Sequence, residues 1–410
     1  MAHRLRRNAA MTDIDSTAAA RQAPWTCPFC PLLCDTFNVA TGSTSLALLG
    51  SDCALARAGL AQFDSTAAPP RLEGQACDLD TAIAAAAQTL AASRQPLFGG
   101  LGTDVAGARS LYTLACETGA ICDPVQGAAL MHGLRALQDR GGYTTTLAEV
   151  RTRADLIVCV GGLPTDKHPE FFKRCGMAAT DPRVVVLADE GDLFDTVAQL
   201  AAQVQQPRAR ASLAVAALSR RLHAAKYAVI VYESGRLPAH GALIVEGLYR
   251  IVATLNRTTR AAALALGGGD GAATVNQVFT WLSGLPLRSR AGPAGLEHEP
   301  VRFDASRLLA DGAVDALLWV QSFRPDPAPP ATALPCIVLG HPGLARACAQ
   351  ASVFIPVSTP GLGSSGHLFR TDGVVLLPLH AVASDGLPTV AEVVTRLRAA
   401  LVTLRAGLAA

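Results

Sequence analysis

Four cysteines near the N-terminus have the types and spacing of a metal-ligand set. The stretch TCPFCPLLCD holds Cys27, Cys30 and Cys34, and Cys53 follows in GSDCALARAGLAQF. A tight C-x2-C-x3-C turn can bring three thiolates to one point, and a fourth can complete a tetrahedral site. Iron–sulfur clusters and structural zinc both accept four thiolates, so the spacing predicts a metal site of either kind. The alternative is four metal-free cysteines that pack as small hydrophobic residues.

The composition describes a chain with ample core material and little net charge. Its 410 residues are 50% hydrophobic and 17% charged, and the net charge is +2. A chain of this length exceeds one ordinary core, which predicts about two to three domains or one large α/β body. The small net charge gives no reason to expect a nucleic-acid surface. No apolar run reaches the about 18 residues of a transmembrane helix, so we expect no membrane insertion.

The first residues indicate the compartment. Residues 1–24 include basic side chains but no apolar core segment, so they do not have the pattern of a secretory signal. We expect a flexible N-terminus and a cytoplasmic protein, in which thiols stay reduced and disulfides are not expected.

Short apolar runs that end in glycine or acidic residues alternate with amphipathic runs along the chain. The expected strands are 96–102, 154–162, 183–192, 227–236, 260–271, 314–322 and 335–343. The expected helices between them include 103–120, 212–225 and 240–256. Continuous Val, Ile and Leu runs are typical of strands buried on both faces of a parallel sheet. The pattern predicts an α/β chain with Rossmann-like parallel sheets, which bind ligands past the carboxyl ends of their strands.

The domain order follows from these runs and from a linker-like stretch. Residues 198–211 contain a proline and little aromatic content, and we expect them to join two halves of the chain. The expected order is a flexible N-terminus (1–24), a four-cysteine segment (25–75), a first α/β domain (76–205), a second α/β domain (206–385) and a C-terminal helix (386–410).

Several segments in the same order resemble the B subunit of formylmethanofuran dehydrogenase, a member of the molybdopterin oxidoreductase superfamily. The four cysteines match the superfamily's N-terminal cluster pattern. The other matching segments are TLAEVRTRADLIVCVGGLPTDKHPEFFKR (146–174), NQVFTWLSGLPL (276–287) and GHLFRTDGVVLLPL (366–379). The resemblance spans about residues 25–385. It implies a [4Fe–4S] cluster at the four cysteines and a cleft for a metal-bound pterin.

One departure from the family bears on its reaction. In the dehydrogenase, a cysteine or selenocysteine in a CHGP stretch, followed by ALQ, ligates tungsten or molybdenum. The matching stretch here is LMHGLRALQ, in which His132 and Gly133 align and Met131 occupies the thiolate position. A thioether is uncharged and is a poor ligand for a high-valent metal. Leu163 also replaces an asparagine of the family, so the resemblance implies that the tungsten or molybdenum pterin is absent.

A related set of proteins fits that loss, namely the B subunits of the formyltransferase/hydrolase complex of methylotrophs. That complex moves a formyl group from tetrahydromethanopterin to a methanofuran analogue and hydrolyses it to formate, with its chemistry in other subunits. The resemblance implies a non-redox structural subunit whose partners are amidohydrolase-like, formyltransferase-like and small subunits. Two alternatives stay open: a working dehydrogenase subunit with a tungsto- or molybdopterin and a [4Fe–4S] cluster, and a zinc-binding scaffold.

The remaining candidates belong to the vestigial pterin cleft that the resemblance implies. They are His132, Gly133, His168, Arg370 and Asp372. His168 follows an expected strand, where a ligand would bind, but it also suits the start of a helix. Arg370 and Asp372 can form a local ion pair. The GGGDG stretch that follows an expected strand can cradle a phosphate or a pterin, or form an ordinary tight turn.

Overall fold

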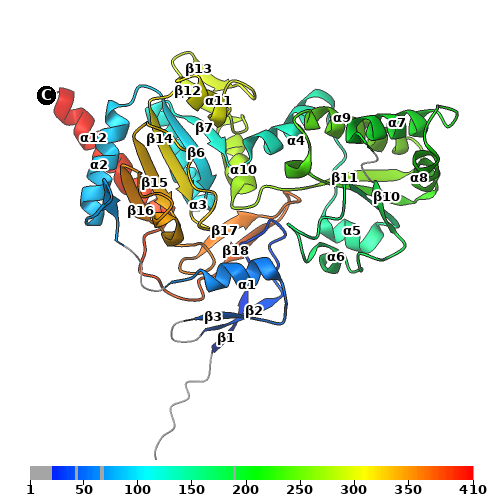
Figure 1. Ribbon diagram of the computed structural model, residues 1–410, viewed down its shortest axis with the longest axis horizontal. Coiled ribbons are helices and arrows are strands. Elements are labelled where there is room, and N and C mark those ends of the chain that lie inside the picture. The colour runs from blue at the N-terminus through cyan, green and yellow to red at the C-terminus, as the bar shows by residue number, and fades with distance from the viewer. Residues whose placement is uncertain (1–20, 42–44, 65–68, 188–190, 410) are drawn as a thin grey trace, which may run out of the picture.

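The computed structural model describes residues 21–41, 45–64, 69–187 and 191–409. Figure 1 shows two α/β units side by side, with a small β-sheet and a helix beside their junction. That small sheet is antiparallel and contains β1 (Arg21–Trp25), β2 (Phe37–Thr41) and β3 (Leu46–Leu49). Helix α1 (Ala54–Ala61) follows it. The flexible stretch expected at 1–24 lies outside the described residues, except for its last four residues, which pair in β1.

The larger unit is built on a sheet in which nine described strands lie in the order β13-β12-β7-β6-β14-β15-β16-β4-β5. Its parallel centre consists of β7 (Ile121–Pro124), β6 (Pro96–Gly102), β14 (Ala316–Gln321), β15 (Cys336–Gly340) and β16 (Val353–Pro356). Its edges are β12 (Ser289–Gly292), β13 (Gly295–His298), β4 (Arg71–Leu72) and β5 (Gln75–Ala76).

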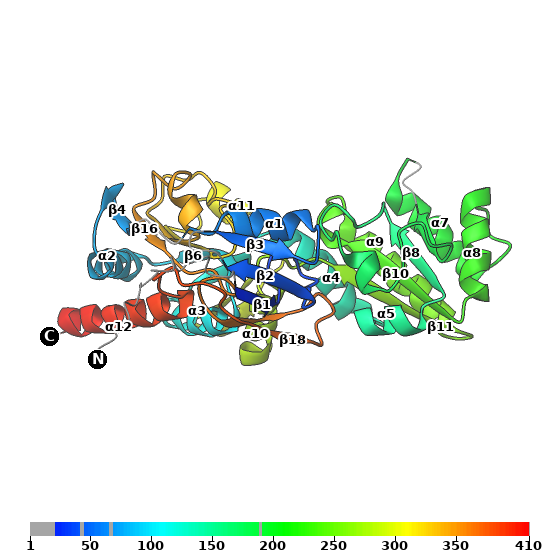
Figure 2. The ribbon, with the colours of Figure 1, turned by 90° about the horizontal axis from the view of Figure 1, so that it is seen from below.

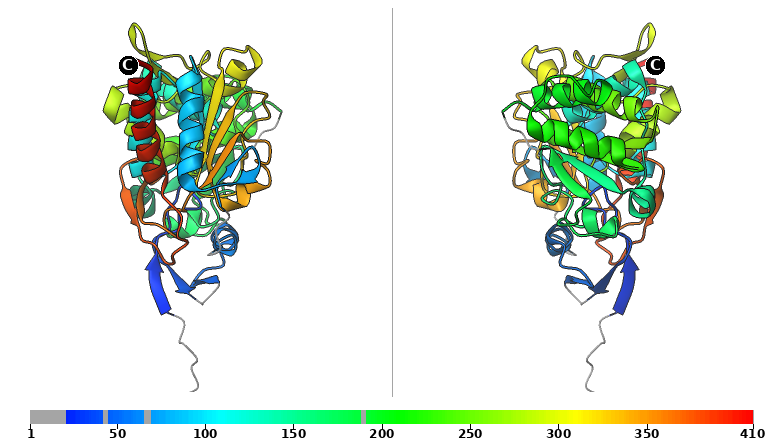
Figure 3. Two further views of the ribbon diagram at one scale, coloured as in Figure 1. Left: turned by 90° about the vertical axis from the view of Figure 1, so that its left-hand side faces the viewer. Right: turned by 90° about the vertical axis from the view of Figure 1, so that its right-hand side faces the viewer.

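Helices cover both faces of this sheet because alternate side chains of each strand point to opposite faces. Phe98 and Leu318 pack on one face, while Leu97 and Leu317 pack on the other. The first face is covered by α2 (Leu79–Ala92), α3 (Val105–Thr118), α10 (Ala272–Ser283) and α12 (Val390–Ala409). The second face carries α11 (Ala305–Ala310) and η2 (Pro342–Ala345). Figure 3 shows α2 and α12 along the outer side of this unit.

The smaller unit is a parallel sheet in which four described strands lie in the order β11-β10-β8-β9. The strands are β11 (Arg260–Leu266), β10 (Tyr227–Glu233), β8 (Leu156–Val160) and β9 (Val184–Leu187). One face packs on α7 (Leu193–Gln205), α8 (Leu213–Ala224) and α9 (Gly241–Leu255). The other face packs on α5 (Leu147–Arg153), α6 (Phe171–Arg174) and the four-cysteine segment.

Several connections hold the units together. Helix α4 (Gly127–Arg140) follows β7 of the larger sheet and packs against α9 of the smaller unit. The hairpin of β17 (Gly366–Phe369) and β18 (Leu376–Leu379) lies below the junction (Figure 1). Just after β17, the Thr371 amide donates to the carbonyl of Pro31 at 2.8 Å, and its hydroxyl donates to the carbonyl of Ala265 at 3.0 Å. The hairpin therefore ties the N-terminal segment to the smaller sheet.

The α/β class and the parallel strands are confirmed, but the two sheets do not divide at residue 205. Strands β8 and β9 precede that residue and β10 and β11 follow it, yet the four strands form one sheet. Strands β6 and β7 likewise join β14 and β15. The linker expected at 198–211 includes most of α7, whose apolar side pairs with α8 over the smaller sheet. The smaller unit is thus inserted between two parts of the larger one. Among the described helices, none combines the length and the apolar character that a bilayer crossing requires.

Candidate functional site

A cavity of about 400 Å³ lies where the two units and the N-terminal segment meet. Its walls come from the carboxyl ends of β10 and β11, from the segment after β8, from α4 and from the turn that carries Cys30. This is the position at which open parallel sheets bind ligands. The polar residues of the lining include Gln126, Lys167, His168, Tyr232, Ser234, Asp270 and Arg324.

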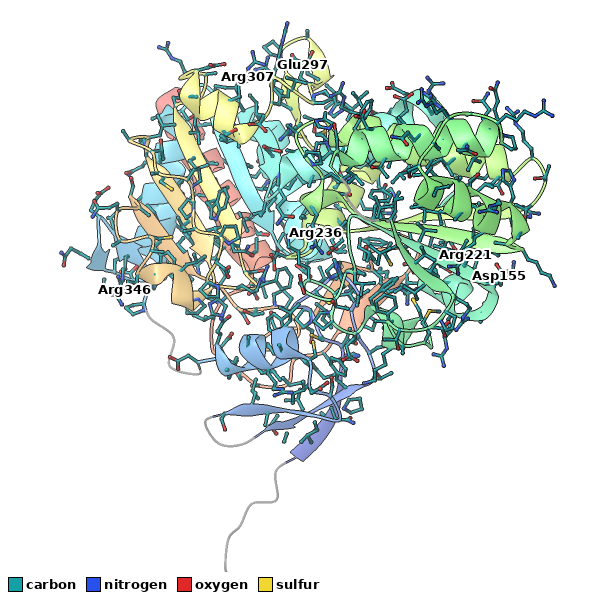
Figure 4. All side chains as sticks on the ribbon, turned by 45° about the vertical axis from the view of Figure 1, so that its right-hand side comes forward. Asp155, Arg221, Arg236, Glu297, Arg307 and Arg346 are labelled. Atoms are coloured by element: carbon teal, nitrogen blue, oxygen red, sulfur yellow. The ribbon has the colours of Figure 1, made fainter. Side chains whose placement is uncertain are left out.

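His168 is held in the cavity wall by a carboxylate at the end of β10. Its Nδ1 lies 2.9 Å from Oε1 of Glu233, and both side chains are buried. Arg236 donates to the second carboxylate oxygen at 2.9 Å and to the carbonyl of Leu163 at 3.1 Å. Burial alone would raise the pKa of Glu233, but the hydrogen bonds from His168 and Arg236 outweigh it and lower that pKa. Figure 4 labels Arg236 at the junction of the units.

The GGGDG loop joins β11 to α10 and forms another part of the wall. Gly271 has a φ of +79°, and a Cβ placed on it would lie 2.2 Å from the carbonyl oxygen of Thr103, so this position requires glycine. Asp270 pairs with Arg324, whose Nε lies 2.8 Å from its Oδ1. Burial raises the pKa of Asp270 even though Arg324 opposes that shift. The loop is therefore a packed turn that also faces the cavity.

The four cysteines are all buried and lie in one apolar cluster with Trp25 and Phe29. The Cys27 amide donates to the carbonyl of Cys34 at 2.9 Å, which closes the turn. Burial raises the pKa of Cys30 to about 12, and burial together with the charge of Cys30 raises the pKa of Cys27 well above its ordinary value. The raised pKa favours the neutral thiol of Cys27 and of Cys30, and a bound metal has to displace those protons. Among the described residues, no group of three or more His, Cys, Asp or Glu side chains is placed to hold a metal ion, so the metal site stays a prediction.

Helix α4 separates the residues that the family pattern groups together. Gly133 lines the cavity, whereas Met131 and His132 line a second hollow on the other side of the helix. Met131 is 4% exposed, and the His132 ring lies so close to α9 that a Cβ on Gly241 would be 2.8 Å from its Cδ2. Consecutive helix positions face different directions, which explains the separation.

Arg370 and Asp372 form the predicted ion pair, with Nη2 of the arginine 2.6 Å from Oδ2 of the aspartate. Both side chains of the pair are largely buried, and Asp372 also accepts a hydrogen bond from the amide of Leu147 at 3.2 Å, at the start of α5. Thr371, between the two, lines the cavity, while Arg370 and Asp372 are not among the lining residues. The pair therefore fixes the β17–β18 hairpin under the cavity.

Sequence reasoning missed several polar residues of the site, among them Glu233 and Arg324. Glu233 has a readable signal, because it is the first charged residue after the apolar run of β10, at the carboxyl end of a parallel strand. Arg324 has none, since it belongs to the loop after β14 in the other sheet and reaches Asp270 only in the folded chain.

The architecture and the cavity define an α/β protein of parallel sheets with a ligand-type site at its strand ends. No family model matches the chain. It is 35% identical over 358 residues to the B subunit of the formyltransferase/hydrolase complex Fhc of Methylorubrum extorquens, and the match covers 81% of this chain and 97% of that protein. The chain belongs to the family of these B subunits.

Solved and more distant relatives agree with this assignment. A chain in the crystal structure of the formyltransferase/hydrolase complex FhcABCD from Methylorubrum extorquens with methylofuran superposes with a TM-score of 0.73 at 33% identity, covering 82% of this chain and 99% of that one. The B subunit of tungsten-containing formylmethanofuran dehydrogenase 2 is 24% identical over 420 residues in Methanococcus maripaludis, with 90% and 96% of the chains covered. Its counterpart in Methanocaldococcus jannaschii is 26% identical over 397 residues, with 85% and 91% covered.

Proposed function

We propose that this chain is the non-redox, structural B subunit of a cytoplasmic formyltransferase/hydrolase complex that carries one-carbon units from formaldehyde toward formate. Its family membership supports the proposal, and the observation that carries it is the identity and placement of Met131. A thioether stands where the dehydrogenases have their metal-binding thiolate or selenolate, and it faces away from the cavity.

The partners follow from the same relationship. The relative of known structure is part of a complex named FhcABCD. We propose that this chain assembles with an amidohydrolase-like, a formyltransferase-like and a small subunit, which carry out the transfer and hydrolysis. The parallel sheets and the cavity between them then represent a molybdopterin oxidoreductase type of fold whose redox reaction has been lost.

The two cofactors of the dehydrogenase family fit this chain differently. Thiols are the donors that a [4Fe–4S] cluster requires. Burial raises the pKa of Cys30 and Cys34, and the charge of Arg174 opposes that rise and so favours the thiolates that a cluster needs. We propose that Cys27, Cys30, Cys34 and Cys53 hold such a cluster, with a structural role; zinc is the alternative. The tungsten or molybdenum pterin does not fit, because α4 offers no thiolate to the cavity.

The proposal is tested on the complex purified anaerobically after co-expression of this chain with its partner subunits. We expect formate release from the formylated furan cofactor, no viologen-linked oxidation of it, and no stoichiometric tungsten or molybdenum. Stoichiometric tungsten or molybdenum together with viologen reduction would establish the dehydrogenase alternative instead.

The cysteine site has its own readout in iron, zinc and acid-labile sulfide content. The double variant Cys27→Ala/Cys53→Ala is expected to lose the iron and sulfide. The matched control is Cys336→Ala, which removes a thiol that is similarly buried but lies in the larger sheet. Zinc without sulfide in the parent complex would support the zinc scaffold. The absence of both iron and zinc would mean that the four cysteines only pack as part of an apolar core.

A further inference from the structure

The hollow on the far side of α4 is a groove that no step of the proposed function uses. It has a volume of about 530 Å³ and lies between α4, the start of α9 and residues 300–307. We call it the α4 groove. Figure 1 shows these elements along the upper edge of the molecule, where the two units meet, and Figure 4 labels Arg307 on α11 at that edge.

The groove carries a surplus of positive charge. Its cationic and titratable basic side chains are His132, Arg135, His240, Arg288 and Arg307. Among the described lining residues, Asp304 is the only carboxylate.

The three arginines of the groove differ in how they are paired. Arg288 is satisfied by Asp123, at 2.9 Å, and by Asp304. Arg307 lies 3.3 Å from Asp311, but both side chains are more than half exposed, so this pair is weak. Arg135 is exposed and forms no ion pair with a described residue. Arg135 is therefore the arginine of the groove without a carboxylate partner among the described residues, and Arg307 is held only by an exposed pair that a stronger partner can replace.

Apolar side chains stand beside these cations. Leu243 is 54% exposed and Val301 is 55% exposed, on opposite walls of the groove, and Met131 forms part of its floor. Large exposed apolar side chains that flank arginines are typical of protein interfaces. The first turn of α9 adds to the same wall, because no side chain caps its amide groups and its dipole favours negative charge.

We propose that the α4 groove binds an acidic segment of a partner subunit, whose carboxylates pair with Arg135 and Arg307 and whose apolar side chains cover Leu243 and Val301. Charge complementarity selects this occupant. A nucleic acid is disfavoured because the groove offers no aromatic ring for stacking besides its histidines. An anionic membrane surface is disfavoured because the cations line a concave groove and not a flat face. The inference rests on the proposed function, since it requires partner subunits.

The test uses the full chain, purified alone and titrated into the purified remainder of the complex. The double variant Arg135→Glu/Arg307→Glu reverses both free charges. The matched control, Arg208→Glu/Arg220→Glu, reverses two exposed arginines near α8, at the far end of the smaller unit (Figure 2). Thermal unfolding of both variants verifies that they fold.

We expect the dissociation constant to rise at least about tenfold for the groove variant and by less than about twofold for the control, with parent binding that weakens as salt increases. Hydrogen–deuterium exchange is expected to slow at 239–243 and 300–307 on assembly. Equal binding by parent and groove variant, or protection confined to other segments, overturns the inference and leaves the proposed function intact. If the parent chain does not bind the remaining subunits at all, the proposed function fails. Binding to vesicles of phosphatidylcholine and phosphatidylserine that the groove variant loses while assembly is unchanged would assign the groove to a membrane and also overturn the inference.

Discussion

The cavity and the α4 groove lie on two sides of one helix, and they differ in how their charges are satisfied. In the cavity wall, Glu233 accepts hydrogen bonds from His168 and Arg236, and Asp270 pairs with Arg324. In the groove, the charges of Arg135 and Arg307 exceed the carboxylates available to them. The carboxylates of Glu233 and Asp270 in the inner site are thus taken up by partners within the chain, whereas Arg135 of the outer site has no carboxylate partner among the described residues.

This difference fits the proposed loss of redox chemistry. A site that must bind a charged cofactor keeps polar groups free for it, because binding requires partners that the protein has not already used. In this cavity the carboxylates of Glu233 and Asp270 are already paired within the chain and are not free for such a cofactor. An unpaired charge on the surface costs little free energy in water, and it contributes to binding only when a partner of opposite charge covers it. The comparison predicts that cavity substitutions act on stability and groove substitutions act on assembly.

The largest expected effect comes from Glu233→Ala. Removing a buried carboxylate leaves His168 and Arg236 without their shared acceptor, which we expect to lower the free energy of unfolding by about 3 kcal/mol. Urea denaturation of the full chain measures it. The control is Glu297→Ala, which breaks a half-buried pair with Arg290 (Figure 4 labels Glu297) and should cost less than about 1 kcal/mol. Equal effects of the two substitutions would contradict the view that the cavity is held by its own charges.

Gly59→Ala tests the part of the cavity wall that the four-cysteine segment (25–75) forms. A Cβ at this position would lie 2.2 Å from the ring of Phe29, a cavity-lining residue, so the ring has to move. We expect a loss of about 2 kcal/mol in the urea experiment. Gly407→Ala in α12 is the matched control, because it meets nothing within 4 Å and should be neutral or slightly stabilising. A neutral Gly59→Ala would mean that this wall is loosely packed.

Local structure was readable from the sequence to a greater extent than long-range arrangement. The run at 96–102 became β6 with the same ends, since buried parallel strands are marked by continuous apolar residues. The sheet order was not readable, because the pairing of β8 with β10 depends on contacts between segments far apart in the chain. The candidate site was only partly readable for the same reason. A family pattern groups Met131, His132 and Gly133 by position, but each step along a helix turns about 100°, which divides them between two faces.

The pH dependence of stability separates two contributions of Glu233 to the free energy of unfolding, namely its negative charge and its hydrogen-bond geometry. Its pKa is lowered in the folded chain, so its contribution is complete above the ordinary value of 4.5 and is lost as the pH falls through the lower folded value. The parent is therefore expected to lose stability faster than Glu233→Gln below pH 4.5, and the gap between their free energies of unfolding should narrow by about 1.4 kcal/mol per pH unit at most. Urea midpoints between about pH 7 and about pH 3.5 measure it. A gap that does not change with pH would show that the hydrogen-bond geometry, and not the charge, holds His168.

The smallest expected effect is that of Arg135→Ala/Arg307→Ala on the isolated chain. Neither arginine has a strong partner within the described part of the chain. Burial and then the charge of Arg135 lower the pKa of His132, so the removal of Arg135 lets that pKa rise. We expect the free energy of unfolding to change by less than about 0.5 kcal/mol, in either direction, as for ordinary surface positions. Thermal and urea unfolding of the isolated chain measure it, and the same variant should still bind the partner subunits more weakly. A loss of several kcal/mol in the isolated chain would mean that these arginines stabilise the fold. The view that the α4 groove acts on assembly and not on stability would then be contradicted.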